Sequence, residues 1–285
     1  MVPSQLALLD VVKPTLSIDT TDWQAIHAES WRGFCGYAGV KKRVYRTVVL
    51  PWRRVHLSTT PADTALTGAI IPPSGVLFHG PSGCGKTVAA ECLASSLGLP
   101  MIRVRAANVL DKWLGGSEAT IRSLFARARS AAPCVLFFDE IDAIATNRST
   151  DTDTVDVMSR VLSTLLNEMD GVSTDKTAPK VLVVACTNRL EALDAALLRP
   201  GRLDEHVGLY KLKNVDDVEA VLRHYLARAP LDAALDLRHV AVGLVQSKAL
   251  SGAEIEGLCR AAVLKAIRRA TLNDSLNITS SDFNR

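Results

Sequence analysis

The sequence predicts an α/β protein: an open parallel sheet of five strands between helices, followed by a small helical domain. Three observations lead to this expectation. From Gly75 onward, short apolar stretches alternate with stretches of helical pattern. Two of the apolar stretches, Val135–Phe138 and Val181–Cys186, are unbroken, which is typical of parallel strands covered on both faces. After about Lys213 the strand-like stretches stop and only helical patterns follow, so we expect a separate helical unit there.

The composition narrows the class of protein. At 285 residues the chain has room for a large core and a second, smaller domain. A net charge of +3 indicates no bulk attraction to nucleic acid or to a membrane. The sequence has no apolar run of membrane-spanning length and no signal-peptide pattern at Met1. The six cysteines include no C-x-x-C pair, which indicates buried thiols in a reducing compartment. We therefore expect a cytoplasmic protein without a membrane span.

The first part of the chain is weakly patterned. Residues 1–30 form a lead-in, in which Leu6–Thr15 is consistent with the end of a helix stopped by proline. Trp31–Pro51 has valines at roughly helical spacing together with a basic stretch, Lys41, Lys42, Arg43 and Arg46. Such a stretch more often forms the solvated face of a helix than a contact with nucleic acid. Ser58–Pro73 is expected to be a loop.

From Gly75 the elements follow one another closely. We expect strands at Gly75–His79, Met101–Arg105, Val135–Phe138, Val181–Cys186 and, at an edge, His206–Tyr210. The helices between them are expected at Val88–Leu97, Ser117–Arg129, Val155–Met169 and Ala192–Leu198. Three more helices are expected at Asp216–Arg228, Asp236–Val245 and Gly252–Arg269. The predicted domains are a lead-in at 1–30, an α/β domain at 31–213 and a small helical lid at 214–285.

A phosphate-binding pattern separates the first expected strand from the following helix. Residues 80–87, here called the phosphate loop, read G-x-x-x-x-G-K-T in the strand–loop–helix context that this motif needs. Glycines let the backbone turn its N–H groups toward a phosphate, and the helix N-terminus adds its positive dipole end. Lys86 is expected to reach the β- and γ-phosphates of ATP, and Thr87 to hold Mg²⁺. The candidate nucleotide-binding residues are Gly80, Pro81, Ser82, Gly83, Cys84, Gly85, Lys86, Thr87 and Val88.

Two carboxylates come directly after the third expected strand. Asp139 and Glu140 come directly after Val135–Phe138, the pattern of a Walker B motif. Asp139 is expected to bind Mg²⁺, directly or through water. Glu140 is expected to orient and deprotonate the water that attacks the γ-phosphate, and general-base help of this kind contributes roughly 10²–10⁴-fold.

An asparagine and two arginines are further candidates for catalysis. Asn188 follows the strand Val181–Cys186, and its neutral amide can bond both water and the γ-phosphate without adding charge. Arg199 and Arg202 flank a Pro-Gly turn that fixes their spacing. We expect neither arginine to have a partner in its own chain. Both are expected to act as arginine fingers on a neighbouring subunit's ATP, which contributes about 10³–10⁵ in rate.

Taken together, these motifs resemble those of the AAA-family ATPases, a branch of the AAA+ superfamily of P-loop NTPases. The resemblance covers about Trp31 to Ala270 and rests on the strings GPSGCGKT, LFFDEID, ACTNRLEALDAALLRPGRLDE and SGAEIEGLCRAA. The pattern looks closest to the second ATPase module of two-ring members, including valosin-containing-protein-like, spermatogenesis-associated and peroxin ATPases. The family usually has one more helix after Ile278–Arg285, so we expect a fragment or a shortened member.

The resemblance implies roles for residues whose local pattern alone indicates none. It places four kinds of segment: an adenine contact, a lid histidine, a second sensor near the ribose and base, and a loop that grips substrate. Cys35 and Gly36 match the adenine contact, and His224 matches the lid histidine. Gly252 and Ala253 match the second sensor. Lys112, Trp113 and Leu114 match the loop that grips substrate. Asp170 and Gly171 match a segment that signals between subunits.

The resulting expectation is an ATP-hydrolysing ring, by resemblance a hexamer, that remodels or unfolds protein substrates with ATP and Mg²⁺. The ring can be homo- or hetero-oligomeric, and the adaptor, the substrate and any association with an organelle through partners stay open. A module that binds ATP but mainly scaffolds a ring is one alternative. A nucleic-acid motor is another, which would favour basic substrate loops, whereas the segment around Trp113 is aromatic with a single lysine.

Overall fold

The computed structural model describes residues 10–12, 23–56, 72–110, 117–145, 152–174, 181–273 and 277–283. The chain separates into two compact units. The first, here the α/β unit, comprises Met1–Trp31, Val40–Gly80 and Lys86–Gly208. The second, here the helical unit, comprises Arg32–Gly39, Pro81–Gly85 and Leu209–Arg285. The domain division predicted at residues 213 and 214 stays a prediction.

The α/β unit is built on one sheet of six strands in the order β1-β3-β4-β5-β2-β6. Its strands are β1 (Asp10–Val12), β2 (Gly75–His79), β3 (Met101–Arg105), β4 (Cys134–Asp139), β5 (Val181–Thr187) and β6 (Glu205–Gly208). All neighbouring strands from β3 to β6 are parallel, which confirms the predicted five-stranded parallel sheet. The helix end expected within Leu6–Thr15 is wrong for its middle residues, because β1 extends the sheet by antiparallel pairing with β3.

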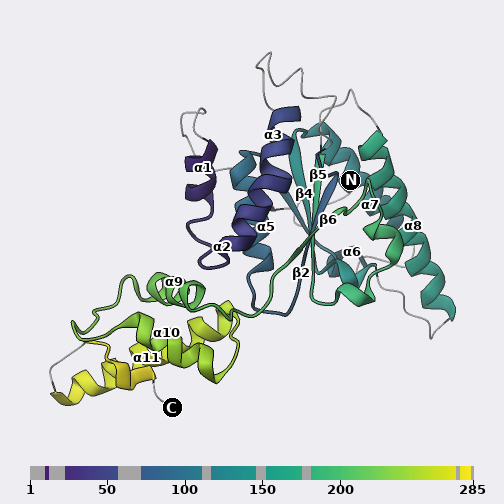
Figure 1. Ribbon diagram of the computed structural model, residues 1–285. Helices are drawn as coiled ribbons and strands as arrows, with labels where there is room; N and C mark the ends of the chain where they lie inside the picture. Colours follow the sequence, from purple (N-terminus) through teal and green to yellow (C-terminus); the bar gives the residue numbers. More distant parts are fainter. Residues whose placement is uncertain are drawn as a thin grey trace, which may run out of the picture. The chain divides into compact units, whose positions relative to one another are not determined.

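Helices cover both faces of this sheet (Figure 1). On one side lie α1 (Trp23–Ser30), α2 (Ala38–Val44), α3 (Leu50–His56) and α5 (Lys86–Leu97). On the other lie α6 (Ala107–Leu110), α7 (Ser117–Ser130) and α8 (Thr152–Thr174). Strand β5 is buried along its whole length, and β4 is buried up to Asp139, as their unbroken apolar sequences predict.

The segment Trp31–Pro51, whose valines have roughly helical spacing, is divided. Gly36 and Tyr37 both have positive φ, which prevents a helix from passing through them, so α2 begins only at Ala38. A π-helical stretch, Tyr45–Val49, then joins α2 to α3. Arg43, an exposed cation of α2, pairs with Glu205 at 2.9 Å. Short 3₁₀ turns occupy Ile141–Ala143, Leu190–Ala192 and Ala195–Leu198.

The helical unit contains α9 (Val215–Leu226), α10 (Leu237–Ser247), α11 (Gly252–Asn273) and the 3₁₀ turn η6 (Ser280–Phe283). Asparagine and aspartate cap the first two helices: Asn214 accepts from the N–H of Asp216, and Asp236 from that of Arg238. An isolated bridge between Leu212 and Leu250 ties the start of the unit to the approach to α11. Among the helices of the described residues, none is long and apolar enough to cross a membrane.

Candidate functional site

The phosphate loop has the backbone that its sequence predicts. Strand β2 ends at His79, and all three glycines of the loop have positive φ: +137° at Gly80, +78° at Gly83 and +82° at Gly85. Positive-φ glycines spaced along a tight turn let the backbone direct its N–H groups toward an anion. The loop therefore fits a phosphate.

In the α/β unit, Lys86 and Thr87, the last two residues of the phosphate loop, begin α5. Lys86 is buried, and its Nζ donates to the carbonyl oxygen of Gly80 at 2.8 Å. The Thr87 Oγ1 lies 3.4 and 3.3 Å from Oδ1 and Oδ2 of Asp139. A hydroxyl beside a carboxylate is a donor set that suits Mg²⁺, which prefers oxygen ligands. The structure thus brings together the residues predicted to hold the metal.

Glu140 has a strained backbone. It is exposed at the end of β4, with φ +53° and ψ +51° in the left-handed region, where a non-glycine residue is uncommon. Strained residues of this kind occur preferentially at functional sites. Asp139 is partly buried beside it. The two carboxylates therefore differ in environment, as their predicted roles require.

Asn188 is exposed just after β5 and has a polar neighbour that the sequence did not reveal. The buried Thr187 hydroxyl donates to Asp142 Oδ1 at 3.0 Å and accepts from the backbone N–H of Arg189 at 3.0 Å. Thr187 thus fixes the turn that carries Asn188. In the sequence, the only sign of this role is the position of Thr187 at the end of a strand.

The two predicted finger arginines differ in their contacts. Within the described part of the chain, the exposed Arg199 guanidinium has no hydrogen-bond or ion-pair partner. Arg202 donates from Nε and Nη2 to the two oxygens of Asp170, both at 2.8 Å, and from Nη1 to Ala196 O at 2.6 Å. The expectation that neither arginine has a partner in its own chain is wrong for Arg202, because the turn after Ala196 places it opposite the last turns of α8.

In the helical unit, the phosphate-loop residues Pro81–Gly85 contact the start of α11. The N–H of Ala253 donates to the carbonyl oxygen of Gly83 at 3.1 Å. Ser251 and Glu254 form a capping box before this helix: Glu254 N donates to Ser251 Oγ at 3.2 Å, and Ser251 N to Glu254 Oε2 at 2.8 Å. The predicted second-sensor residues, Gly252 and Ala253, therefore lie at the helix end that bonds the loop.

The segment predicted to contact adenine also lies in the helical unit. The side chain of Phe34 is buried, Cys35 is partly exposed, and its thiol donates to Arg32 O at 3.5 Å. Gly36 has a φ of +71° and faces α9 so closely that a Cβ would lie 3.0 Å from the Asp217 carbonyl oxygen. His224 is exposed further along α9.

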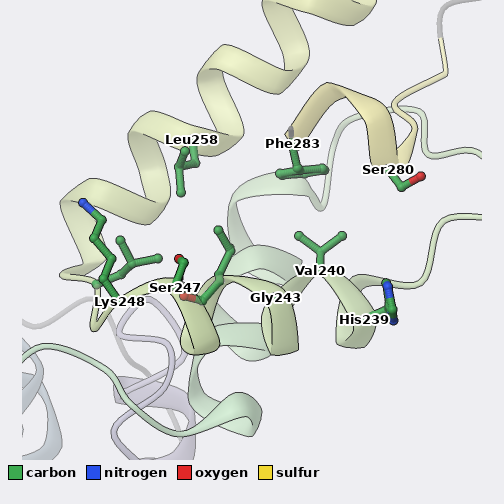
Figure 2. A pocket seen from close by; sticks show the side chains of 10 residues that line it. His239, Val240, Gly243, Ser247, Lys248, Leu258, Ser280 and Phe283 are labelled. Carbon is green, nitrogen blue, oxygen red and sulfur yellow. Dashed lines mark hydrogen bonds between the residues drawn. The ribbon is translucent and has the colours of Figure 1, made fainter. Parts of the chain in front are cut away.

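One predicted segment and one pocket remain to be placed against these residues. The predicted substrate loop, Lys112, Trp113 and Leu114, lies outside the described residues. A pocket of about 650 Å³ lies between α10, α11 and η6, lined by residues such as Val240, Leu258 and Phe283 (Figure 2). None of the predicted site residues lines it.

Comparison with known proteins decides the family. Residues 76–210, which carry the phosphate loop, both carboxylates, Asn188 and both arginines, match the model of the "ATPase family associated with various cellular activities (AAA)". This segment belongs to the AAA ATPase family. The AAA segment includes four of the parallel strands and most of β2, and it excludes α9–α11.

Two curated relatives match a longer part of the chain. One is the "Peroxisomal ATPase pex6" of Schizosaccharomyces pombe, 40% identical over 210 residues, which are 74% of this chain and 22% of the relative. The other is a "Putative cell division cycle ATPase" of Plasmodium falciparum, 35% identical over 239 residues, 84% of this chain and 18% of the relative. The chain thus spans about a fifth of the length of these curated relatives.

Proposed function

We propose that this AAA module hydrolyses ATP. The observation that supports this most directly is the pairing of the Thr87 hydroxyl with the Asp139 carboxylate, one residue after the buried Lys86. Thr87 and Asp139 would hold Mg²⁺. When bound, the ion would neutralise developing charge on the phosphates. Lys86 would exchange its bond with Gly80 O for the nucleotide phosphates.

Glu140 is the proposed general base. Its carboxylate is exposed to water next to Asp139, and in this role it takes the proton of the attacking water. Asn188 would hold that water in line through its amide. The two residues therefore have different roles: the charged Glu140 carboxylate accepts the proton, and the neutral Asn188 amide orients the water.

The test compares Glu140→Gln with the unchanged chain. Glutamine keeps the size of the side chain but cannot accept the proton, so we expect ATP binding to persist and turnover to fall at least about 10²-fold. Glu191→Gln, also exposed and outside the proposed site, is the matched control and should hydrolyse normally. Undiminished turnover in Glu140→Gln would remove Glu140 from the base role. Absence of turnover in the unchanged chain, even as an assembled ring, would favour the alternative of an ATP-binding scaffold.

The proposed working form is a ring, by family resemblance a hexamer, of this chain alone or with a related one. The exposed Arg199, without a partner among the described residues, supports this because a free guanidinium suits a neighbour's phosphates. Light scattering of Glu140→Gln with and without ATP tests the ring. Growth to a defined larger mass with ATP is expected, and a monomer under both conditions would refute it.

Protein remodelling is the proposed use of the hydrolysis. It rests on the segment Lys112–Leu114, which resembles a substrate-gripping loop. Trp113→Ala should leave basal hydrolysis intact and stop unfolding of a protein substrate. The names of the relatives point to different settings, a peroxisome and the cell division cycle. We propose a cytoplasmic module that reaches an organelle only through partners.

A further inference from the structure

Tyr37 has a backbone conformation that its side chain disfavours. Its φ is +54°, directly after Gly36 at +71°, and left-handed backbone is rare for a bulky aromatic residue. Such a conformation persists only where the surroundings fix it, and it occurs preferentially at ligand sites. The side chain is 8% exposed, so its neighbours must supply the fixing contacts.

The helical unit holds the turn around Tyr37 at several atoms. The Tyr37 hydroxyl donates to the carbonyl oxygen of Tyr210 at 2.8 Å. The N–H of Ala38 lies 3.3 Å from Asp217 Oδ1, and at Gly36 a side chain would be strained by the positive φ and crowded by the Asp217 carbonyl. The contacts with Asp217 anchor the turn to the first turn of α9, and the bond from Tyr37 anchors it to Tyr210, which precedes that helix.

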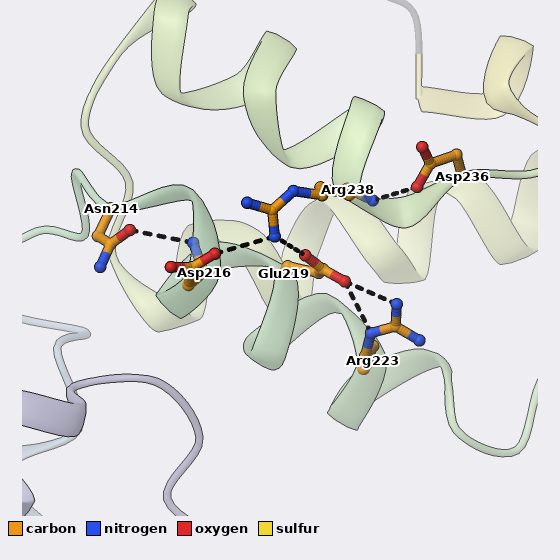
Figure 3. A network of polar contacts seen from close by, with 6 residues as sticks. All are labelled: Asn214, Asp216, Glu219, Arg223, Asp236 and Arg238. Atoms are coloured by element: carbon orange, nitrogen blue, oxygen red, sulfur yellow. Dashed lines mark hydrogen bonds and ion pairs between the residues drawn. The ribbon is translucent and has the colours of Figure 1, made fainter.

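Polar contacts link the start of α9 to α10 (Figure 3). Asn214 caps the helix, and Arg238 of α10 reaches Asp216 at 2.9 Å and Glu219 at 3.2 Å. Glu219 also pairs with Arg223. The anchor for Tyr37 is therefore tied to a second helix.

The Tyr37 ring also supports the phosphate loop. It stacks on Phe34, with ring centroids 5.2 Å apart and planes inclined by 19°. Phe34 in turn covers Gly85, where a Cβ would lie 2.7 Å from its Cε2. The Cys84 thiol, which is 1% exposed, neighbours the phenol. Burial is the main cause that raises the pKa of Tyr37 above its usual range, and the nearby Cys84 raises it further. The phenol thus stays protonated and keeps donating to Tyr210.

We propose that Tyr37 is a positioning residue for the phosphate loop. With Phe34 it clamps Cys84 and Gly85 to the helical unit and holds the loop in its binding shape before a nucleotide arrives. The bond from Ala253 to Gly83 O holds the preceding loop residue. A loop ordered in advance loses less entropy on binding. This inference deepens the proposed function, and only its nucleotide measurement rests on that function.

The first test measures the loop without nucleotide. The variants are Tyr37→Phe, which loses only the bond to Tyr210, and Tyr37→Leu, which also loses the ring. Tyr210→Phe is the control, because it removes an exposed hydroxyl and keeps the carbonyl that Tyr37 uses. Alkylation of each cysteine is followed by mass spectrometry. In Tyr37→Leu we expect Cys84 to react about tenfold faster, with a smaller rise in Tyr37→Phe and none in the control.

Two other buried thiols, Cys134 and Cys186, report on the whole fold. Their reactivity should stay unchanged in the same samples. A parallel rise at all three cysteines would mean that Tyr37 supports the fold alone, and the positioning role would be abandoned. An unchanged Cys84 would overturn it as well.

The second test measures binding of fluorescent ADP. Tyr37→Phe should raise the dissociation constant roughly two- to tenfold, the effect of one hydrogen bond, with turnover at saturating ATP little changed. A faster-reacting Cys84 with unaltered ADP affinity would overturn the positioning role. If the unchanged chain itself fails to bind ADP, the proposed function fails, while the thiol measurement still decides whether the clamp exists.

Discussion

Arg202 and Asp170 form a two-bond ion pair within one chain. Nε meets Oδ1 and Nη2 meets Oδ2, each at 2.8 Å, in the parallel geometry that makes arginine–carboxylate pairs specific. The pair joins the turn after Ala195–Leu198 to the last turns of α8. Arg202 is 16% exposed, whereas Asp170 is half exposed. The orientation of Arg202 therefore depends on Asp170, a residue that family resemblance assigns to signalling between subunits.

Removing the charge of Asp170 should weaken the fold slightly. Because one partner is half exposed, Asp170→Asn is expected to lower the free energy of unfolding by about 0.5–1 kcal/mol. The bonds from Arg202 lower the pKa of Asp170, so the stabilisation is present above the unfolded-state pKa of about 3.9. It is lost as the pH falls through the lower folded-state pKa. Urea unfolding, followed by tryptophan fluorescence, measures the difference.

The control for this pair is Asp216→Asn. Asp216 pairs with Arg238, but both side chains are more than half exposed, so no measurable change is expected. Equal losses in the two variants, or a loss in Asp170→Asn that does not shrink as the pH is lowered, would contradict the role given to the ion pair.

The capping box of α11 should show a similar pH dependence. Hydrogen bonds from the Ser251 backbone and from Lys211 lower the pKa of Glu254 to about 2. Its contribution is thus present above the ordinary glutamate pKa of about 4.3 and is lost as the pH falls through about 2. Glu254→Ala should cost about 1 kcal/mol at neutral pH, as for other helix caps. It should also weaken ADP binding, because Ala253 N–H then holds Gly83 less firmly. A stability loss that does not shrink on acidification would contradict this.

Glu140 should show a trade of stability against activity. A left-handed non-glycine residue is strained, so Glu140→Gly is expected to leave folding unchanged or stabilise it by up to about 1 kcal/mol while turnover is lost. Glu140→Gln, which keeps the strain, should lose turnover at unchanged stability. Thermal unfolding of the two variants side by side checks this. Clear destabilisation by glycine would mean that the side chain has a structural role.

The features that local sequence determines could be predicted. The unbroken apolar runs predicted β4 and β5, and the spacing of Gly80, Gly85 and Lys86 predicted the phosphate loop. Contacts between distant segments could not be predicted. The strand β1 forms because β3 offers an open edge, and the pair of Arg202 with Asp170 depends on where α8 ends. The strained turn at Tyr37 lay hidden for the same reason, since its fixing partner, Tyr210, is far away in the sequence.

Loss of Arg199 and loss of Arg202 should have different effects. Arg199 is exposed, so Arg199→Ala should leave the unfolding curve unchanged and lower turnover in the assembled ring by about 10³–10⁵-fold, roughly 4–7 kcal/mol in barrier. Arg202→Ala should lower stability as well, because both hydrogen bonds from Arg202 to Asp170 are lost. Specific activity should rise with protein concentration as rings form. Mixing Arg199→Ala with Glu140→Gln subunits should restore some turnover, because an intact Glu140 and an intact Arg199 then meet at mixed contacts. No complementation, together with concentration-independent activity, would mean that Arg199 acts within its own chain or not at all.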